Sequence, residues 1–137
     1  MKTILIDASL VVTALLQENL KVENRFKSLL KSAQYKNILL ISTKFLNLEV
    51  ANALRFGIKD KEKCLNLIND FAKLPIKTFV LSKNQIYSAV ETSYYLGTTV
   101  YDTSYHILAK THGATFLTCD EEYYKKAKNL GDIDYLG

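Results

Sequence analysis

The sequence is poor in residues that interrupt secondary structure or cross-link a chain. Its 137 residues include one proline, five glycines and two cysteines. With so few interruptions there is no candidate linker, repeat or low-complexity tract, and we expect one domain over residues 1–137. Cys64 and Cys119 lie far apart and lack metal-ligand spacing, so the sequence predicts neither a zinc site nor a disulfide framework.

Long hydrophobic runs are also missing. No apolar stretch approaches the roughly 20 residues that cross a bilayer, and Asp7 comes too early for the core of a signal peptide. We therefore expect a cytoplasmic protein without a membrane partner. The formal charge of +4 is compatible with a polyanionic partner, although many basic proteins bind no nucleic acid. A glycine-rich phosphate loop is absent after the first predicted strand, which argues against a nucleotide cofactor.

The order of predicted elements indicates the fold class. Short apolar or β-branched runs predict strands at residues 3–6, 38–42, 77–80 and 115–118, with a shorter fifth strand at 133–135. Helical periodicity predicts helices at 8–16, 22–32, 45–56, 61–73 and 83–96, followed by two helices that begin at Asp102 and Asp120. This alternation predicts an α/β domain of three layers, α/β/α, with a mostly parallel sheet of four or five strands.

Acidic residues stand where such sheets place their sites. Asp7 directly follows the first strand, and Asp120 follows strand 115–118 with one residue between. Asp102 stands at the start of a helix, and Glu49 lies about one to two turns inside another. Because sites in open parallel sheets form at the carboxyl ends of the strands, we expect these four side chains to converge there.

Each acid also has a purely structural explanation. Asp7, Asp102 and Asp120 could cap the helices that follow them, and Glu49 could lie on a solvated face. Four converging carboxylates, however, repel one another unless cations lie among them. Mg²⁺ and Mn²⁺ prefer oxygen ligands and support phosphodiester cleavage. The set therefore favours a metal-dependent nuclease over a structural role.

Histidine chemistry is a weaker alternative. His106 and His112 could suggest a metal-free acid–base ribonuclease, but they lie six residues apart on one predicted helix. At that spacing their side chains project to different faces. Surface or core histidines with satisfied hydrogen bonds are the simpler interpretation.

The segments around the four acids resemble the four acidic motifs of PIN-domain ribonucleases. These segments are residues 4–12, 46–54, 101–109 and 113–123, and they follow the order of the family. The resemblance is closest to the VapC-type toxins of prokaryotic toxin–antitoxin pairs. It implies a PIN-like fold in which Asp7 and Asp102 are the principal metal ligands, while Glu49 and Asp120 complete the acidic pocket directly or through water.

The resemblance also implies supporting roles. Ser9 and Thr118 would orient carboxylates or waters; otherwise Ser9 is a helix cap and Thr118 an ordinary strand residue. Near the fourth acid, Lys125, Lys126 and Lys128 either contact RNA phosphates or coat a solvated helix end.

Together these observations predict a Mg²⁺- or Mn²⁺-dependent endoribonuclease that acts as the toxin of a toxin–antitoxin pair. Two alternatives stay open: a housekeeping RNA-processing nuclease, and a catalytically silent RNA- or protein-binding module. As partners we expect RNA, a second copy of the chain and a cognate antitoxin. The antitoxin would place an arginine on the acids and apolar anchors in a groove at helices 22–32 and 61–73.

Overall fold

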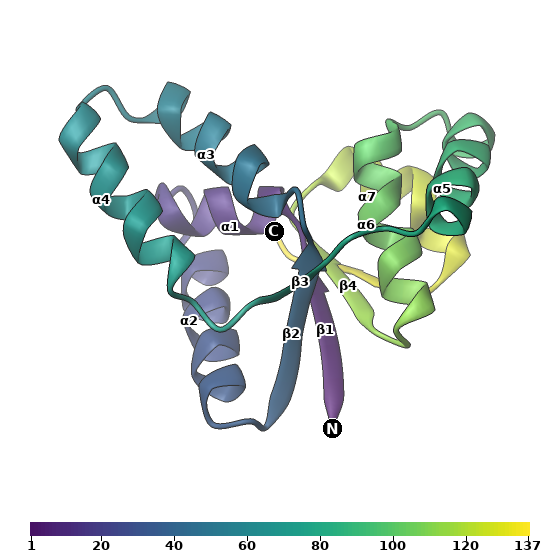
Figure 1. Ribbon diagram of the computed structural model, residues 1–137, viewed down its shortest axis with the longest axis horizontal. Helices are drawn as coiled ribbons and strands as arrows, with labels where there is room; N and C mark the ends of the chain where they lie inside the picture. The colour runs from purple at the N-terminus through teal and green to yellow at the C-terminus, as the bar shows by residue number, and fades with distance from the viewer.

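A parallel sheet of five strands forms the centre of the protein in a computed structural model that describes residues 1–137 (Figure 1). The strands are β1 Lys2–Ile6, β2 Ile38–Thr43, β3 Lys77–Phe79, β4 Thr115–Thr118 and β5 Ile133–Tyr135. Their order across the sheet is β3-β2-β1-β4-β5, and every neighbouring pair is parallel. All five predicted strands are therefore confirmed, and the sheet is parallel throughout.

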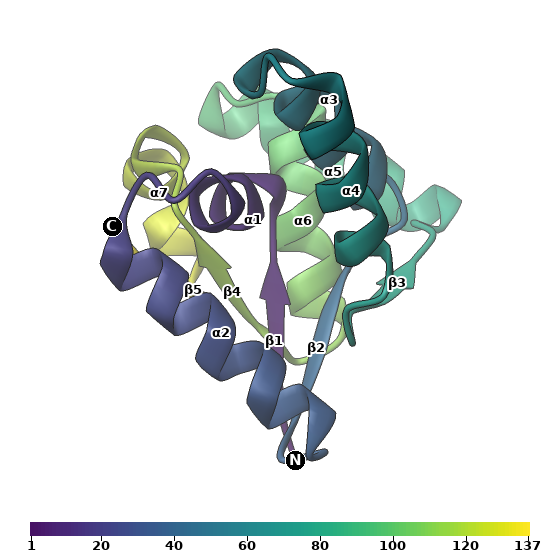
Figure 2. The ribbon, with the colours of Figure 1, turned by 90° about the vertical axis from the view of Figure 1, so that its left-hand side faces the viewer.

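The central position of β1 in the sheet accounts for its apolar sequence. Ile4, Leu5 and Ile6 of β1 are all buried, because β2 and β4 flank the strand and helices cover both faces of the sheet (Figure 2). In register, Leu5 pairs with Ile41 on one side and Phe116 on the other. A continuous apolar run is typical of a strand buried on two faces.

Helices flank the sheet in two layers. Figure 1 shows α1 to α4 on one side of the strands and α5 to α7 on the other. The helices are α1 Ala8–Leu15, α2 Leu20–Gln34, α3 Leu46–Gly57, α4 Lys61–Ala72, α5 Lys83–Leu96, α6 Val100–Thr111 and α7 Glu121–Ala127, and the short 3₁₀ helix Lys128–Leu130 follows α7. The three-layer α/β/α prediction is confirmed.

One predicted helix start is wrong in an informative way. We expected Asp102 to begin a helix, but α6 begins at Val100 and its cap is Thr99, whose hydroxyl accepts a hydrogen bond from the Asp102 N–H at 3.1 Å. Asp102 therefore lies inside the first turn, and its carboxylate is not used as the helix cap.

The carboxyl ends of the strands meet at one side of the sheet, which we call the carboxyl edge. Helices α1, α3 and α7 begin just beyond β1, β2 and β4 respectively, so the residues at these junctions gather there. Neither cysteine forms a disulfide. No helix has the length and apolar character needed to cross a bilayer.

Candidate active site

Asp7 is the most deeply buried of the four acids, with 6% of its surface exposed. It follows β1 and caps α1, where its Oδ1 accepts a hydrogen bond from the Leu10 N–H at 3.1 Å. Burial raises the pKa of its carboxyl to about 6, while hydrogen bonds from Ser9, Thr118 and Leu10 oppose that rise. Without a bound cation, ionisation of the Asp7 carboxyl therefore carries a desolvation penalty.

Two hydroxyls join Asp7 to the end of β4. Ser9 donates to Oδ1 and Thr118 donates to Oδ2, both at 2.6 Å. In turn, Ser9 Oγ accepts from the Cys119 N–H and Thr118 Oγ1 accepts from the Asp120 N–H, both at 3.0 Å. Both carboxylate oxygens of Asp7 are thus fixed in direction. The expected contacts of Ser9 and Thr118 are present, and their catalytic roles stay predictions.

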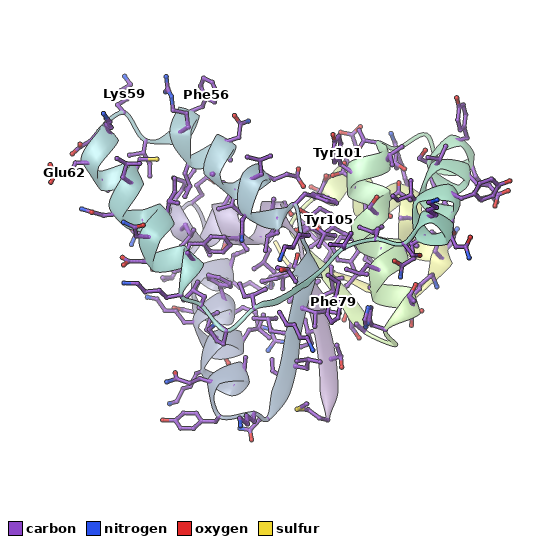
Figure 3. All side chains as sticks on the ribbon, viewed as in Figure 1. Phe56, Lys59, Glu62, Phe79, Tyr101 and Tyr105 are labelled. Atoms are coloured by element: carbon purple, nitrogen blue, oxygen red, sulfur yellow. The ribbon has the colours of Figure 1, made fainter.

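Glu49 lies in the first turn of α3 and is held by a tyrosine from α6. The Tyr105 hydroxyl donates to Glu49 Oε1 at 2.6 Å, and Tyr105 itself is 1% exposed. Figure 3 shows Tyr105 between α3 and α6. Burial raises the pKa of Glu49, the hydrogen bond from Tyr105 lowers it, and the charge of Asp102 raises it further. Tyr105 therefore anchors one oxygen of Glu49 against the opposite helix.

Asp102 links the acids electrostatically. Burial raises its pKa most, the Thr99 hydroxyl opposes that rise, and the charges of Asp120 and Glu122 add to it. Burial raises the pKa of both Asp7 and Glu49, and the negative charge of Asp102 raises both further. The structure thus brings the four acids to the carboxyl edge, with Asp102 within electrostatic reach of the other three.

Asp120 lies on the open side of this group. It caps α7, where its Oδ1 accepts from the Tyr123 N–H at 2.9 Å. With Asp102 it lines a cavity of about 410 Å³ between the starts of α6 and α7. The other lining residues are Gly97, Thr98, Thr99, Glu122, Tyr123 and Lys126.

The donor set fits one kind of metal site better than another. No three carboxylate, imidazole or thiol groups lie close enough together to hold an ion by themselves. Closed zinc sites need such a cluster, whereas Mg²⁺ keeps several waters and takes one or two carboxylates. Asp102 and Asp120, the two of these acids that line the open cavity, supply oxygen ligands of the kind that suits Mg²⁺ or Mn²⁺.

The three lysines near the fourth acid differ in position. Lys126 lines the cavity, donates to the Gly97 carbonyl at 3.1 Å and lies 3.6 Å from a Glu122 carboxylate oxygen. Lys125 pairs with Glu121 at 3.1 Å, and neither it nor Lys128 lines that cavity. Lys126 is therefore the best placed of the three, and RNA binding by any of them stays a prediction.

His106 belongs to the core. It is fully buried, its Nε2 donates to the Gly131 carbonyl at 2.8 Å, and its Nδ1 is therefore the acceptor for the Tyr123 hydroxyl at 2.9 Å. Burial lowers the pKa of the imidazole. With both ring nitrogens occupied, His106 ties α6 to α7 and has no free nitrogen for acid–base chemistry.

The sequence-based search missed two contributors to the site. Thr99 stands three residues before Asp102, the spacing of a helix cap and the first-turn acid of a capping box, so the pattern itself contained the signal. Tyr105 stands three residues after Asp102 and therefore shares its helix face. Its contact with Glu49 bridges 56 positions of the chain, and no local pattern predicts it.

The chain is thus an α/β domain of three layers with one parallel sheet and acidic residues at its carboxyl edge. No family model and no curated protein matches the chain. Several solved structures share its fold, including the following two. The PAE2754 protein of Pyrobaculum aerophilum is 22% identical with a TM-score of 0.63, and the match covers 93% of this chain and 87% of that one. VapBC2 of Rickettsia felis, solved bound to a DNA fragment from its promoter, is 14% identical with a TM-score of 0.68, covering 98% and 97%. At these identities the likeness shows a shared fold.

Proposed function

We propose that this chain is a Mg²⁺- or Mn²⁺-dependent endoribonuclease that cleaves RNA phosphodiesters. One observation carries the proposal: Asp102 and Asp120 line one cavity at the carboxyl edge, where Asp7 and Glu49 also lie at the starts of α1 and α3. A site that only bound RNA would gain nothing from carboxylates, because they repel phosphate. The acids therefore favour catalysis over a silent RNA- or protein-binding module.

Each acid has a distinct part in the proposed reaction. Asp7 and Asp102 hold the cation, and Glu49 and Asp120 complete its surroundings directly or through water. When bound, the cation supplies an activated water and neutralises charge on the phosphodiester. The two hydroxyls on Asp7 and the phenol on Glu49 keep those carboxylates directed without metal. Lys126 lines the cavity and would contact a phosphate in this proposal.

The direct test is cleavage of total cellular RNA. The protein should cut RNA with Mg²⁺ or Mn²⁺ and stop when EDTA is added, and Asp102→Asn should be inactive while its circular dichroism spectrum is unchanged. Full activity in EDTA, or in Asp102→Asn, would contradict the proposal.

We further propose that this nuclease is the toxin of a two-protein module. The fold is shared over nearly the whole chain with VapBC2, a complex solved on promoter DNA. A housekeeping processing nuclease would have the same fold and chemistry, so growth is the discriminating measurement. Expression of this chain alone should arrest growth, and co-expression with the adjacent small open reading frame should restore it. Unchanged growth would favour the processing nuclease.

An antitoxin would occupy two surfaces. An arginine could pair with the acids in a bidentate manner and compete with the cation. A cavity of about 850 Å³ lies beside α4, and its four apolar lining residues, Leu15, Leu16, Ile58 and Leu67, would contact the apolar anchors. The other eight lining residues are mostly polar or charged. The sequence predicts the groove at helices 22–32 and 61–73, whereas this cavity lies between α4 and the end of α1, and no residue of α2 lines it. Replacing that arginine in the antitoxin should restore RNA cleavage by the complex.

A homodimer completes the proposal. Helix α5 exposes an apolar stripe at helical spacing, made of Ile86, Tyr87, Val90 and Tyr94. Exposed stripes of this kind are typical of surfaces that bind a partner. Light scattering should give twice the monomer mass, and Tyr87→Glu should halve it. A wild-type monomer at micromolar concentration would argue against the dimer.

A further inference from the structure

At its end far from the sheet, α3 exposes a large aromatic ring next to an arginine. Phe56, in the last turn of α3, is 75% exposed. The guanidinium carbon of Arg55 lies 5.0 Å from the centre of its ring. Figure 3 shows Phe56 and Lys59 at the end of α3 far from the sheet, projecting away from the body of the protein.

This surface is continuous with the acids. Glu49 and Phe56 are seven residues apart in α3, so they share one face of the helix about 10 Å apart along its axis. Across the edge, Tyr101 in the first turn of α6 is 65% exposed, with its ring 5.5 Å from that of Phe45. Figure 3 places Tyr101 on the same upper side as Phe56. Exposed aromatic rings therefore flank the acids on two helices.

The cations around Phe56 have no acidic partner. Arg55, Lys59, Lys61 and Lys63 form no ion pair in the structure, whose salt bridges all lie elsewhere. The two acids of the same segment are Asp60, whose carboxylate caps α4, and Glu62 in the first turn of α4, so residues 55–63 keep a net positive charge. Unpaired cations attract phosphates, and aromatic rings stack with unpaired bases. The surface thus has cations that can bind the phosphates of single-stranded RNA and a ring on which its bases can stack.

We propose that single-stranded RNA reaches the acids along this face of α3, with a base stacked on Phe56 and phosphates held by Arg55 and Lys59. The inference rests on the proposed function, because it names how the substrate of that same site is bound. Since Arg55 covers one face of the ring, the base occupies the other face. Duplex RNA fits less well, because its base faces are already stacked.

A second copy of this chain is the competing occupant. In a two-fold dimer the same surface meets itself, so Arg55 and Lys59 of both copies would lie close together. Residues 55–63 carry four cations and the two carboxylates of Asp60 and Glu62, and the net positive charge of the segment opposes that arrangement. RNA is the occupant whose charge complements the surface.

Fluorescence anisotropy in EDTA tests the binding without cleavage. The probes are a fluorescein-labelled 12-nucleotide oligoadenylate RNA and an RNA duplex of equal length. Phe56→Leu should weaken single-strand binding about tenfold, because the stacking surface is lost. The double variant Arg55→Gln/Lys59→Gln should reduce the slope of log Kd against log salt by about 1.4, the value for two phosphate contacts. Duplex binding should be weaker and insensitive to Phe56→Leu.

Matched controls lie at the opposite end of the strands. Tyr35, 67% exposed, follows α2 and precedes β2, while Lys2 begins β1 and Lys31 is exposed in the last turn of α2. Tyr35→Leu and Lys2→Gln/Lys31→Gln remove the same kinds of groups and should leave binding unchanged.

The outcomes separate the possibilities. Wild-type affinity in Phe56→Leu, an equal loss in the controls, or equal affinity for duplex would overturn the inference. If sedimentation shows that Phe56→Leu dissociates a wild-type dimer while RNA binding is unchanged, the surface belongs to the second copy. If Phe56→Leu loses RNA binding but the wild type cleaves no RNA with Mg²⁺, the RNA surface stands and the proposed nuclease function fails.

Discussion

Asp7 and Asp120 arise from the same local pattern and end in opposite environments. Each follows a parallel strand at its carboxyl end, and each caps the next helix. Asp7 is buried and accepts three hydrogen bonds from the protein, whereas Asp120 is partly exposed, accepts one and lines a cavity. A shared sequence pattern therefore gives two different carboxylates.

The order of the strands explains the difference. Asp7 follows β1, which lies between β2 and β4 in the middle of the sheet, while Asp120 follows β4 beside the short edge strand β5. The central position desolvates Asp7 and surrounds it with donors. We infer a division of the site into a rigid half that holds a cation and an open half that receives RNA.

The largest expected effect is on catalysis. Asp7→Asn and Asp102→Asn should each lower RNA cleavage by about 100- to 1,000-fold, because each removes charge that holds the cation. Asp120→Asn should cost less, since it lies in the open half. Asp132→Asn, an exposed acid paired with Lys110, is the control. A loss in Asp120→Asn as large as in Asp7→Asn would remove the division between the halves.

Stability should change in the opposite direction to activity. The carboxyl of Asp7 titrates near 6 when folded and near 3.8 when unfolded. Below both values it is neutral in both states; as the pH rises through this window, the unfolded chain loses its proton first and the folded state loses stability. Above pH 6 the penalty reaches up to about 3 kcal/mol. In EDTA at pH 8, Asp7→Asn should therefore raise the free energy of unfolding, and the gain should shrink toward pH 4.

Urea denaturation of both proteins at the two pH values measures this gain. Asparagine keeps the helix cap through its Oδ1, but its amide nitrogen cannot accept the hydrogen bond from Thr118, so the gain should be smaller than the full penalty. Destabilisation of Asp7→Asn by the same amount at every pH would show that the buried charge is not the penalty described here.

A smaller effect is expected at the contact between the helices. Tyr105→Phe keeps the buried ring and removes the hydrogen bond to Glu49. Because a residue that orients a ligand typically contributes 10- to 100-fold to metal affinity, Mg²⁺ should bind about tenfold more weakly. Calorimetric titration measures this, with Tyr87→Phe on the exposed surface of α5 as the control. Equal affinities in Tyr105→Phe and wild type would leave Tyr105 with a packing role alone.

The smallest effect separates two neighbouring lysines. Both Lys125 and Lys126 pair with glutamates one turn earlier, but only Lys126 lines the cavity. Lys126→Gln should raise KM for RNA about threefold with little change in kcat, as expected for one phosphate contact. Lys125→Gln should leave both constants unchanged. Equal effects would mean that general surface charge, rather than the cavity, binds RNA.

Local patterns were sufficient to predict much of this molecule. Apolar runs located all five strands, and helical spacing located the helices, because each element shows its own period. The gathering of Asp7 and Asp120 at one edge follows from parallel strands alone. Local sequence patterns do not determine the order of the strands in the sheet. They therefore could not predict that Asp7 is buried while Asp120 is partly exposed. The bond from Tyr105 to Glu49 depends on how α6 packs against α3, which is likewise a tertiary property.

The central claim is that the acidic edge holds a divalent cation, and anomalous diffraction from crystals soaked in Mn²⁺ tests it most directly. The account predicts a manganese peak shared by Asp7 and Asp102 at the carboxyl edge, absent from crystals of Asp102→Asn. Saturating Mn²⁺ with no peak at that edge, or a peak that persists in Asp102→Asn, would contradict it.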